Sequence, residues 1–237
     1  MSWEKQERLP NGRFGSKKVE ATKKVPKKVK KAKSQFINIL LDRSISMSSV
    51  KYETQLGFNK IVNDTYKTAI KEKVKTYWGF SEFGNPYNES YMFSTEHLSP
   101  IEYNPEDTST ALYDGIGYII KQIDHYLTEV PKDTNVVLII QTDGEENSSK
   151  KHSAEGIKAL IEDRRNKGWN ISFVGAGNFS SVQKVSNSIG IFTSNTLNYT
   201  ADRFGTTTAF NKMSDATTNY TRAVSKGETK NIDFFGI

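Results

Sequence analysis

The chain has 237 residues, a net charge of +6 and 35% hydrophobic residues. This length supports one sizeable hydrophobic core and excludes a second large domain, and the absence of Cys excludes a disulfide framework. The sequence opens with polar residues and has no apolar run near the ~20 residues that span a bilayer, so we expect a soluble, cytoplasmic protein.

Positive charge is concentrated in the first 35 residues, which hold ten Lys, two Arg and three Glu. So few large apolar side chains cannot offset the entropy of ordering, and we expect residues 1–34 to form a basic, disordered arm. Three roles stay open for this arm: a solvated tail, contact with nucleic acid phosphates, or docking on an acidic protein surface. The candidate partner contacts are Lys23, Lys24, Lys27, Lys28, Lys30 and Lys31.

After the arm, short apolar runs alternate with stretches of helical periodicity. We predict strands over residues 36–41, 74–83, 89–93, 135–141, 169–175 and 196–200. We predict helices over residues 52–69, 111–127, 154–167, 182–188 and 204–223. This alternation indicates a doubly wound α/β fold with a mostly parallel central sheet, in which ligands bind at the carboxyl ends of the strands.

Side chains with oxygen atoms occur at the ends of these predicted elements. Asp42, Ser44 and Ser46 follow the first strand at alternate positions, Asp143 follows the strand 135–141, and Thr110 precedes a helix. Carboxylate and hydroxyl oxygens are ligands that suit Mg²⁺. The alternative is that these side chains only cap helices and turns.

Three segments of the sequence resemble motifs of the von Willebrand factor A-type (vWA) domain family. They are Asp-Arg-Ser-Ile-Ser from residue 42, Thr-Ala-Leu-Tyr-Asp from residue 110 and Thr-Asp-Gly-Glu-Glu-Asn from residue 142. The likeness covers residues 35–224, and it is closer to small bacterial and bacteriophage members than to integrin or matrix members. It implies a vWA domain followed by a C-terminal tail over residues 225–237.

The resemblance also implies a metal-ion-dependent adhesion site (MIDAS) that binds Mg²⁺ or Mn²⁺. The implied hydroxyl ligands are Ser44, Ser46 and Thr110, and the implied carboxylates, direct or through water, are Asp42 and Asp143. Family members commonly have Gly where this chain has Ile45, which we interpret as a change in loop shape. Thr108 is a rival to Thr110, which we prefer because it directly precedes Ala-Leu-Tyr-Asp.

The C-terminal tail places Phe234 and Phe235 after a polar spacer. An apolar tip of this kind is a candidate docking peptide for a partner. The alternative is that it folds back onto its own domain.

Motifs typical of catalysis are missing from the sequence: there is no phosphate loop, no H-E-x-x-H and no complete dinucleotide fingerprint. We therefore expect no catalytic residues and no enzyme activity, a metal-dependent hydrolase being the weakest alternative. We predict a module that binds a partner protein's Asp or Glu through the divalent cation, without membrane contact. The main alternative is a structural protein associated with nucleic acid or a virion, acting through the basic arm in the host cytoplasm or in the virion.

Overall fold

The computed structural model describes residues 33–95, 97–98, 100–229 and 232–236, and the structural statements below concern these residues. The strands are β1 (Lys33–Asp42), β2 (Val74–Phe83), β3 (Ser90–Ser94), β4 (Asn135–Thr142), β5 (Asn170–Ala176) and β6 (Thr196–Tyr199). The α-helices are α1 (Lys51–Glu72), α2 (Leu112–Tyr126), α3 (Ala154–Asn166), α4 (Phe179–Ser188) and α5 (Arg203–Lys226). Two short 3-10 helices, η1 (Ile45–Val50) and η2 (Thr193–Asn195), precede α1 and β6.

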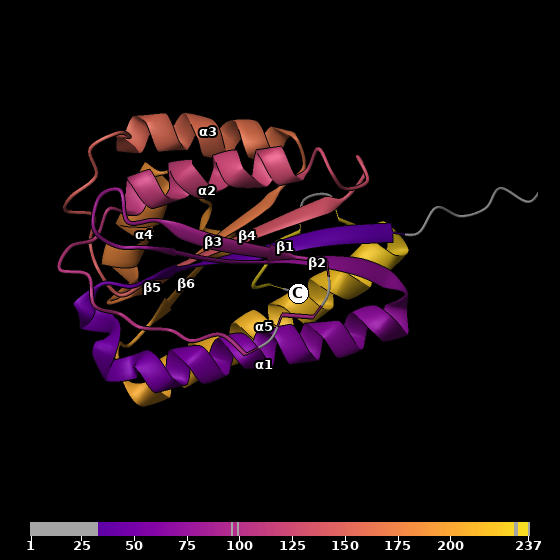
Figure 1. The fold of residues 1–237 in the computed structure, drawn as a ribbon, viewed down its shortest axis with the longest axis horizontal. Coiled ribbons are helices and arrows are strands. Elements are labelled where there is room, and N and C mark those ends of the chain that lie inside the picture. Colours follow the sequence, from indigo (N-terminus) through magenta and orange to yellow (C-terminus); the bar gives the residue numbers. More distant parts are fainter. Residues whose placement is uncertain (1–32, 96, 99, 230–231, 237) are drawn as a thin grey trace, which may run out of the picture. The chain divides into compact units, whose positions relative to one another are not determined.

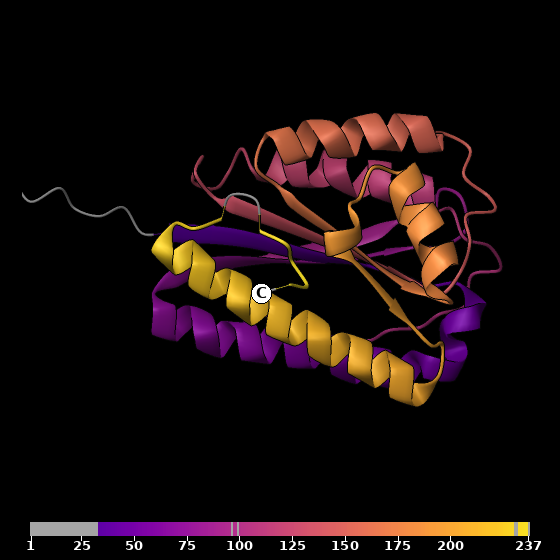
Figure 2. The ribbon, with the colours of Figure 1, turned by 180° about the vertical axis from the view of Figure 1, so that it is seen from behind.

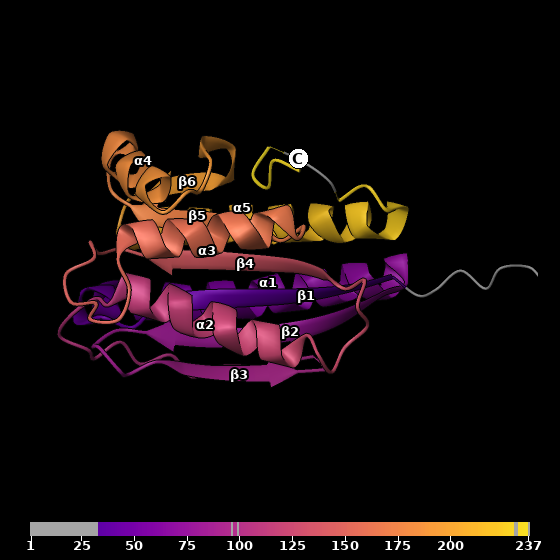
Figure 3. The same ribbon diagram turned by 90° about the horizontal axis from the view of Figure 1, so that it is seen from above.

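The strands form a sheet in the order β3-β2-β1-β4-β5-β6, which is seen from above in Figure 3. Neighbouring strands are parallel except β2 and β3, which are antiparallel. Helices α2, α3 and α4 cover one face of the sheet and α1 and α5 cover the other (Figure 1). Figure 2 shows α5 running alongside α1. The predicted doubly wound α/β fold is therefore confirmed.

Strand β1 lies at the centre of the sheet, with β2 on one side and β4 on the other. Both of its faces are covered by helices, so it consists of a nearly continuous run of buried residues. Phe36 and Leu40 pack in the core under α2 and α3, whereas Ile37 and Ile39 pack in the core under α1 and α5. The strand thus fixes the position of whatever follows its carboxyl end.

Polar side chains define where several helices begin. The side chains of Ser153, Asn178 and Asp202 accept hydrogen bonds from backbone N–H groups in the first turns of α3, α4 and α5, which is the usual way to satisfy these groups. Helix α5 ends at Lys226 and is followed by Gly227, whose φ of 82° favours glycine. Among the described helices, none is both long and apolar enough to cross a membrane.

The predicted strands and helices are all present, with ends that differ by up to three residues. Strand β2 has the predicted bounds, and α1 extends three residues beyond its predicted end. The sequence did not predict the two 3-10 helices or the antiparallel direction of β3. Among the described residues, the first strand begins at Lys33 and the last helix ends at Lys226.

The C-terminal tail folds back onto the domain, which corrects one prediction. Phe234 is fully buried and its ring lies 6.1 Å from that of Tyr220. The backbone N–H of Phe234 also donates to Asn195 Oδ1 at 2.9 Å. Phe235 is partly buried against the same core. Phe234 is therefore not a partner contact, because burying an aromatic ring in its own core is more favourable than leaving it in water.

Candidate metal centre

The register between β1 and β4 brings two of the predicted site segments together. Leu41 pairs with Gln141 across these parallel strands, so Asp42 lies beside Thr142, and Asp143 follows at the same edge of the sheet. Thr110 comes from the segment just before α2. Residues that are about 100 positions apart in sequence thus meet at the carboxyl ends of the central strands.

Four of the five predicted ligands lie in one chain of hydrogen bonds. The Asp42 carboxylate accepts from the Ser44 backbone N–H at 2.8 Å. The hydroxyl oxygens of Ser44 and Ser46 are 3.0 Å apart. Ser46 Oγ then donates to Asp143 Oδ1 at 2.8 Å. The alternate spacing in the sequence therefore brings the two serine hydroxyls together, with Ser46 beside the Asp143 carboxylate.

The fifth predicted ligand, Thr110, faces the same place beside Gly144. A Cβ atom at Gly144 would lie 3.2 Å from Thr110 Oγ1 and 3.7 Å from Asp42 Oδ2. The absence of a side chain at residue 144 thus leaves room between a hydroxyl and a carboxylate. The rival candidate, Thr108, has its hydroxyl 3.4 Å from Asn85 Oδ1.

The loop after β4 is held against the start of α2 by several buried or half-buried contacts. Thr110 and Asn147 form two hydrogen bonds, one from each backbone N–H, at 2.9 and 3.1 Å. Further along, Asp114 accepts three backbone N–H groups at 2.7 to 2.9 Å, from Lys150, Lys151 and His152. These contacts fix Thr110 relative to the loop that carries Asp143.

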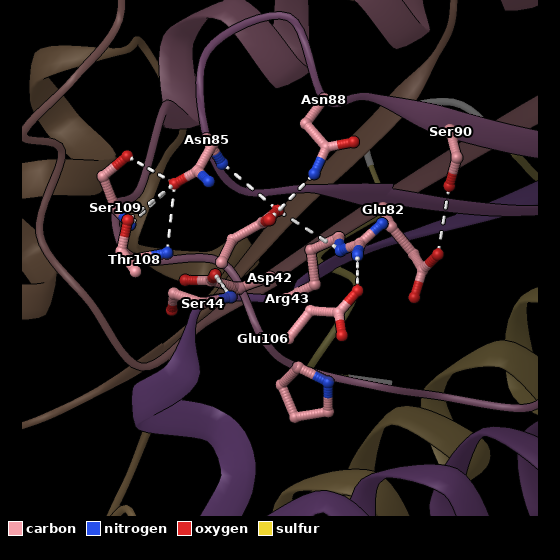
Figure 4. Close-up of polar contacts among 12 residues, drawn as sticks. Asp42, Arg43, Ser44, Glu82, Asn85, Asn88, Ser90, Glu106, Thr108 and Ser109 are labelled. Atoms are coloured by element: carbon pink, nitrogen blue, oxygen red, sulfur yellow. Dashed lines mark hydrogen bonds and ion pairs between the residues drawn. The ribbon is translucent and has the colours of Figure 1, made fainter.

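The first loop is held on its other side by residues 105–109, part of which is drawn in Figure 4. Ser44 and Asp107 form a parallel β-bridge, in which the Ile45 N–H donates to the Asp107 carbonyl at 2.7 Å. The Arg43 guanidinium lies 2.9 Å from Glu106 and 3.2 Å from Asp107. Asn85 Oδ1 accepts the backbone N–H groups of Thr108 and Ser109, both at 3.0 Å (Figure 4).

Burial shifts the titration of both carboxylates. Burial raises the pKa of Asp42 to about 6, against the lowering effect of hydrogen bonds from Thr142 and Ser44, and the nearby charge of Asp143 adds to the rise. Burial also raises the pKa of Asp143, opposed by the hydrogen bond from Ser46. A cation bound beside these two acids would favour their charged forms and lower both pKa values.

The donor set fits a hard divalent cation. It consists of two carboxylates and three hydroxyls, all of them oxygen donors of the kind that Mg²⁺ and Mn²⁺ prefer. No cluster of three or more His, Cys, Asp or Glu capable of holding a metal occurs in the described part of the chain, so the hydroxyls are needed to complete this site.

Sequence reasoning missed three supporting residues. Thr142 donates to Asp42 Oδ2 at 2.5 Å and accepts the Gly144 N–H at 3.0 Å. The Tyr103 hydroxyl donates to the Asp42 carbonyl, and Asn147 holds Thr110 as described above. The sequence could have indicated only Thr142 and Asn147 as site residues, because both lie within the matching Thr-Asp-Gly-Glu-Glu-Asn segment.

The sequence matches no family model, and no curated protein is significantly similar to it. Several solved structures have a similar fold. The VWA domain of SpRpn10 is 12% identical with a TM-score of 0.54, covering 75% of this chain and 94% of that domain. The pilus adhesin SpaC of Lactobacillus rhamnosus GG, in its open conformation, is 11% identical with a TM-score of 0.59, covering 82% of this chain and 30% of the adhesin.

A third similar structure is the proximal thread matrix protein 1 of the mussel byssus with a zinc-occupied MIDAS motif. It is 16% identical with a TM-score of 0.53, covering 82% of this chain and 46% of that protein. The chain spans less than half the length of the matrix protein and of the adhesin. These likenesses show that the chain has the fold of a vWA domain.

The six lysines predicted as partner contacts in the arm lie outside the described residues. Their role therefore stays a prediction.

Proposed function

We propose that this protein is a metal-dependent protein-binding module. The observation that carries the proposal is the convergence of Asp42, Ser44, Ser46, Thr110 and Asp143 at the carboxyl edge of the sheet. A matrix protein with a similar fold has a MIDAS motif occupied by zinc, which supports metal binding at the same kind of edge. We expect Mg²⁺ or Mn²⁺ here because all the donors are oxygen atoms.

The hydroxyl and carboxylate ligands differ in charge and would therefore have different roles. Ser44, Ser46 and Thr110 would supply neutral hydroxyl oxygens, and Asp42 and Asp143 would neutralise the ion. A cation held mainly by neutral hydroxyls stays electrophilic, so it attracts a carboxylate from outside the protein. The partner would therefore present an Asp or Glu side chain at this edge.

The test begins with the purified full chain and a calorimetric titration with Mg²⁺ and Mn²⁺. We expect wild type to bind one equivalent, and Ser44→Ala and Asp42→Asn to bind at least about tenfold more weakly, with unchanged circular dichroism. Ser49→Ala is the matched control, because Ser49 lies exposed in the same segment. Equal affinity in wild type and Ser44→Ala would contradict the proposed site.

The partner is tested by pull-down from host lysate with wild type and Asp42→Asn, in Mg²⁺ or EDTA and at low or high salt. A partner retained only by wild type in Mg²⁺ agrees with capture through the metal. A partner that is indifferent to EDTA but lost in salt and on deletion of residues 1–32 favours the alternative, in which the basic arm of residues 1–34 binds nucleic acid or an acidic surface.

A further inference from the structure

A mainly apolar hollow lies at the same end of the sheet as the candidate metal centre, between β6 and the first turns of α5. Its volume is about 300 Å³, which is enough for one large side chain. Leu197, Tyr199 and Ala209 line its wall, and Phe204 stands at its rim with 83% of its surface exposed. An aromatic side chain so exposed at the start of a helix does not stabilise the domain's own core.

A positive charge lies beside this apolar wall. Lys212, one turn beyond Ala209 on α5, also lines the hollow and is exposed. Its ammonium group forms no ion pair or hydrogen bond with the described residues. A free ammonium group next to an apolar hollow is complementary to a segment that carries an acidic residue beside a large apolar one.

The end of β5 lies between the metal centre and the hollow in the strand order. A depression of about 50 Å³ beside Asp143 and Gly144 reaches Ala176, the last residue of β5. The next residue, Gly177, lines the large hollow. Gly177 has φ of 131°, a conformation that favours glycine, so this residue adds no side chain at the edge of the hollow.

The separation can be estimated from the sheet. Asp143 follows β4, and the hollow begins at the end of β6, two strands away. Neighbouring strands lie about 4.8 Å apart, so the two places are about 10 Å apart, which an extended peptide spans in about three residues.

We propose that the hollow is a second binding subsite for the same partner segment that the metal captures. The segment is extended, binds the cation through an Asp or Glu, inserts a large apolar side chain into the hollow about three residues away, and places a further carboxylate near Lys212. This inference rests on the proposed function for the first of these contacts only.

The experiment selects binders from a phage-displayed library of random linear peptides on the full chain in Mg²⁺. Enriched peptides are synthesised and their affinities measured by fluorescence polarisation. We expect them to share an acidic residue and a large apolar residue at a constant spacing of about three positions. Light scattering on the same protein without peptide tests the other occupant, a second copy of this chain.

Three substitutions address the hollow without touching the metal ligands. Phe204→Ser removes the rim, Thr208→Trp fills the space, and Lys212→Glu reverses the charge. Each should weaken the selected peptides about tenfold and leave Mg²⁺ affinity unchanged. The matched controls are Ile70→Ser and Lys71→Glu, which alter exposed residues in the last turn of α1 and should have no effect.

The outcomes separate the two ideas. If peptide binding needs Mg²⁺ but is not weakened by the three substitutions, the hollow is not a binding subsite, and the proposal of capture through the metal still holds. Peptides that are weakened by the substitutions but indifferent to EDTA support the hollow and contradict metal capture. A library that yields no binder sensitive to the substitutions, or self-association that Phe204→Ser abolishes, overturns the assignment of the hollow to a partner peptide.

Discussion

The hydroxyl of Thr142 donates a 2.5 Å hydrogen bond to the carboxylate of Asp42. The two residues are 100 positions apart and lie at the ends of adjacent parallel strands. The contact orients the one carboxylate of the candidate metal centre that is fully buried. Thr142 is therefore a positioning residue for Asp42.

Replacing Thr142 with Val keeps the shape of the side chain and removes its hydroxyl. We expect metal affinity to fall by about tenfold, because groups that orient a metal ligand are typically worth 10- to 100-fold. Calorimetric titration with Mg²⁺ measures the change. Thr134→Val is the control, because Thr134 bonds to Ser34 at the opposite end of the same strands. A Thr142→Val protein with wild-type affinity would show that Asp42 needs no such partner.

The raised pKa of Asp42 predicts a pH-dependent stability of the metal-free protein. Asp42 in the folded chain keeps its proton up to about pH 6, whereas in the unfolded chain it loses it near pH 3.9. Between these values the folded state binds more protons, so the free energy of unfolding falls as pH rises, by about 3 kcal/mol in total. Urea denaturation in EDTA from pH 4 to pH 7 tests this fall.

Asp42→Asn removes the titrating group and should flatten that decline. Metal affinity of wild type should rise over the same interval, because the cation binds the ionised carboxylate. If wild type and Asp42→Asn show the same pH profile in EDTA, the decline has another origin.

Gly144→Ala places a methyl group in the space between Thr110 and Asp42. Its Cβ would lie only 3.2 Å from Thr110 Oγ1, so we expect metal affinity to fall by about tenfold or more, with little loss of stability. Gly156→Ala is the control, since its Cβ meets nothing closer than 3.7 Å. That variant should bind metal normally and gain up to about 1 kcal/mol, because Ala is the better helix former. Equal metal affinity in both variants would place the cation elsewhere.

Asp114→Asn should loosen the loop after β4. The Asp114 side chain is buried, and burial raises its pKa, but hydrogen bonds from the backbone of Lys150, Lys151 and His152 and from the His152 ring lower it more. The amide brings N–H donors against these donors, and we expect a loss of about 2 to 3 kcal/mol. Hydrogen exchange should show faster exchange over residues 144–153. Unchanged protection there would mean that Asp114 does not hold the loop.

Phe234→Ala tests the folded-back tail. Removing a fully buried Phe side chain costs about 3 to 5 kcal/mol, so the urea midpoint should fall clearly. Phe204→Ala, which changes a side chain that is 83% exposed, should leave the midpoint almost unchanged. A Phe234→Ala protein as stable as wild type would show that the tail contributes nothing to the core.

Periodicity was sufficient to predict the sheet and its helices, because β1 and β4 are continuous apolar runs and α3 ends just before a recognisable stop signal, Gly168. The end of α5 was predicted three residues too early, at residue 223. Periodicity did not indicate η1, whose Ile45-Ser46-Met47 start has no helical pattern. The direction of β3 was also beyond prediction, because the loop before it is held by Asn85 and by contacts to Asp107, 22 residues away.

In the candidate metal centre, too, local features could be predicted from the sequence and long-range contacts could not. The ligand types could be predicted because they lie in short motifs next to strand ends. Thr142 as a partner of Asp42 could not, because that contact depends on the register between β1 and β4. The hollow beside Phe204 depends on how α5 packs against β6. It could not be predicted, because no local sequence pattern indicates such packing.

The start of β1 and the end of α5 lie next to each other. Lys33, at the start of β1, donates through its ammonium group to the carbonyl of Ser225, near the end of α5, at 2.7 Å. Both residues lie at the opposite end of the sheet from Asp42 and Asp143. A protein fused to the domain before Lys33 would therefore be attached at the end of the sheet opposite to the candidate metal centre, and would leave that edge accessible to a partner.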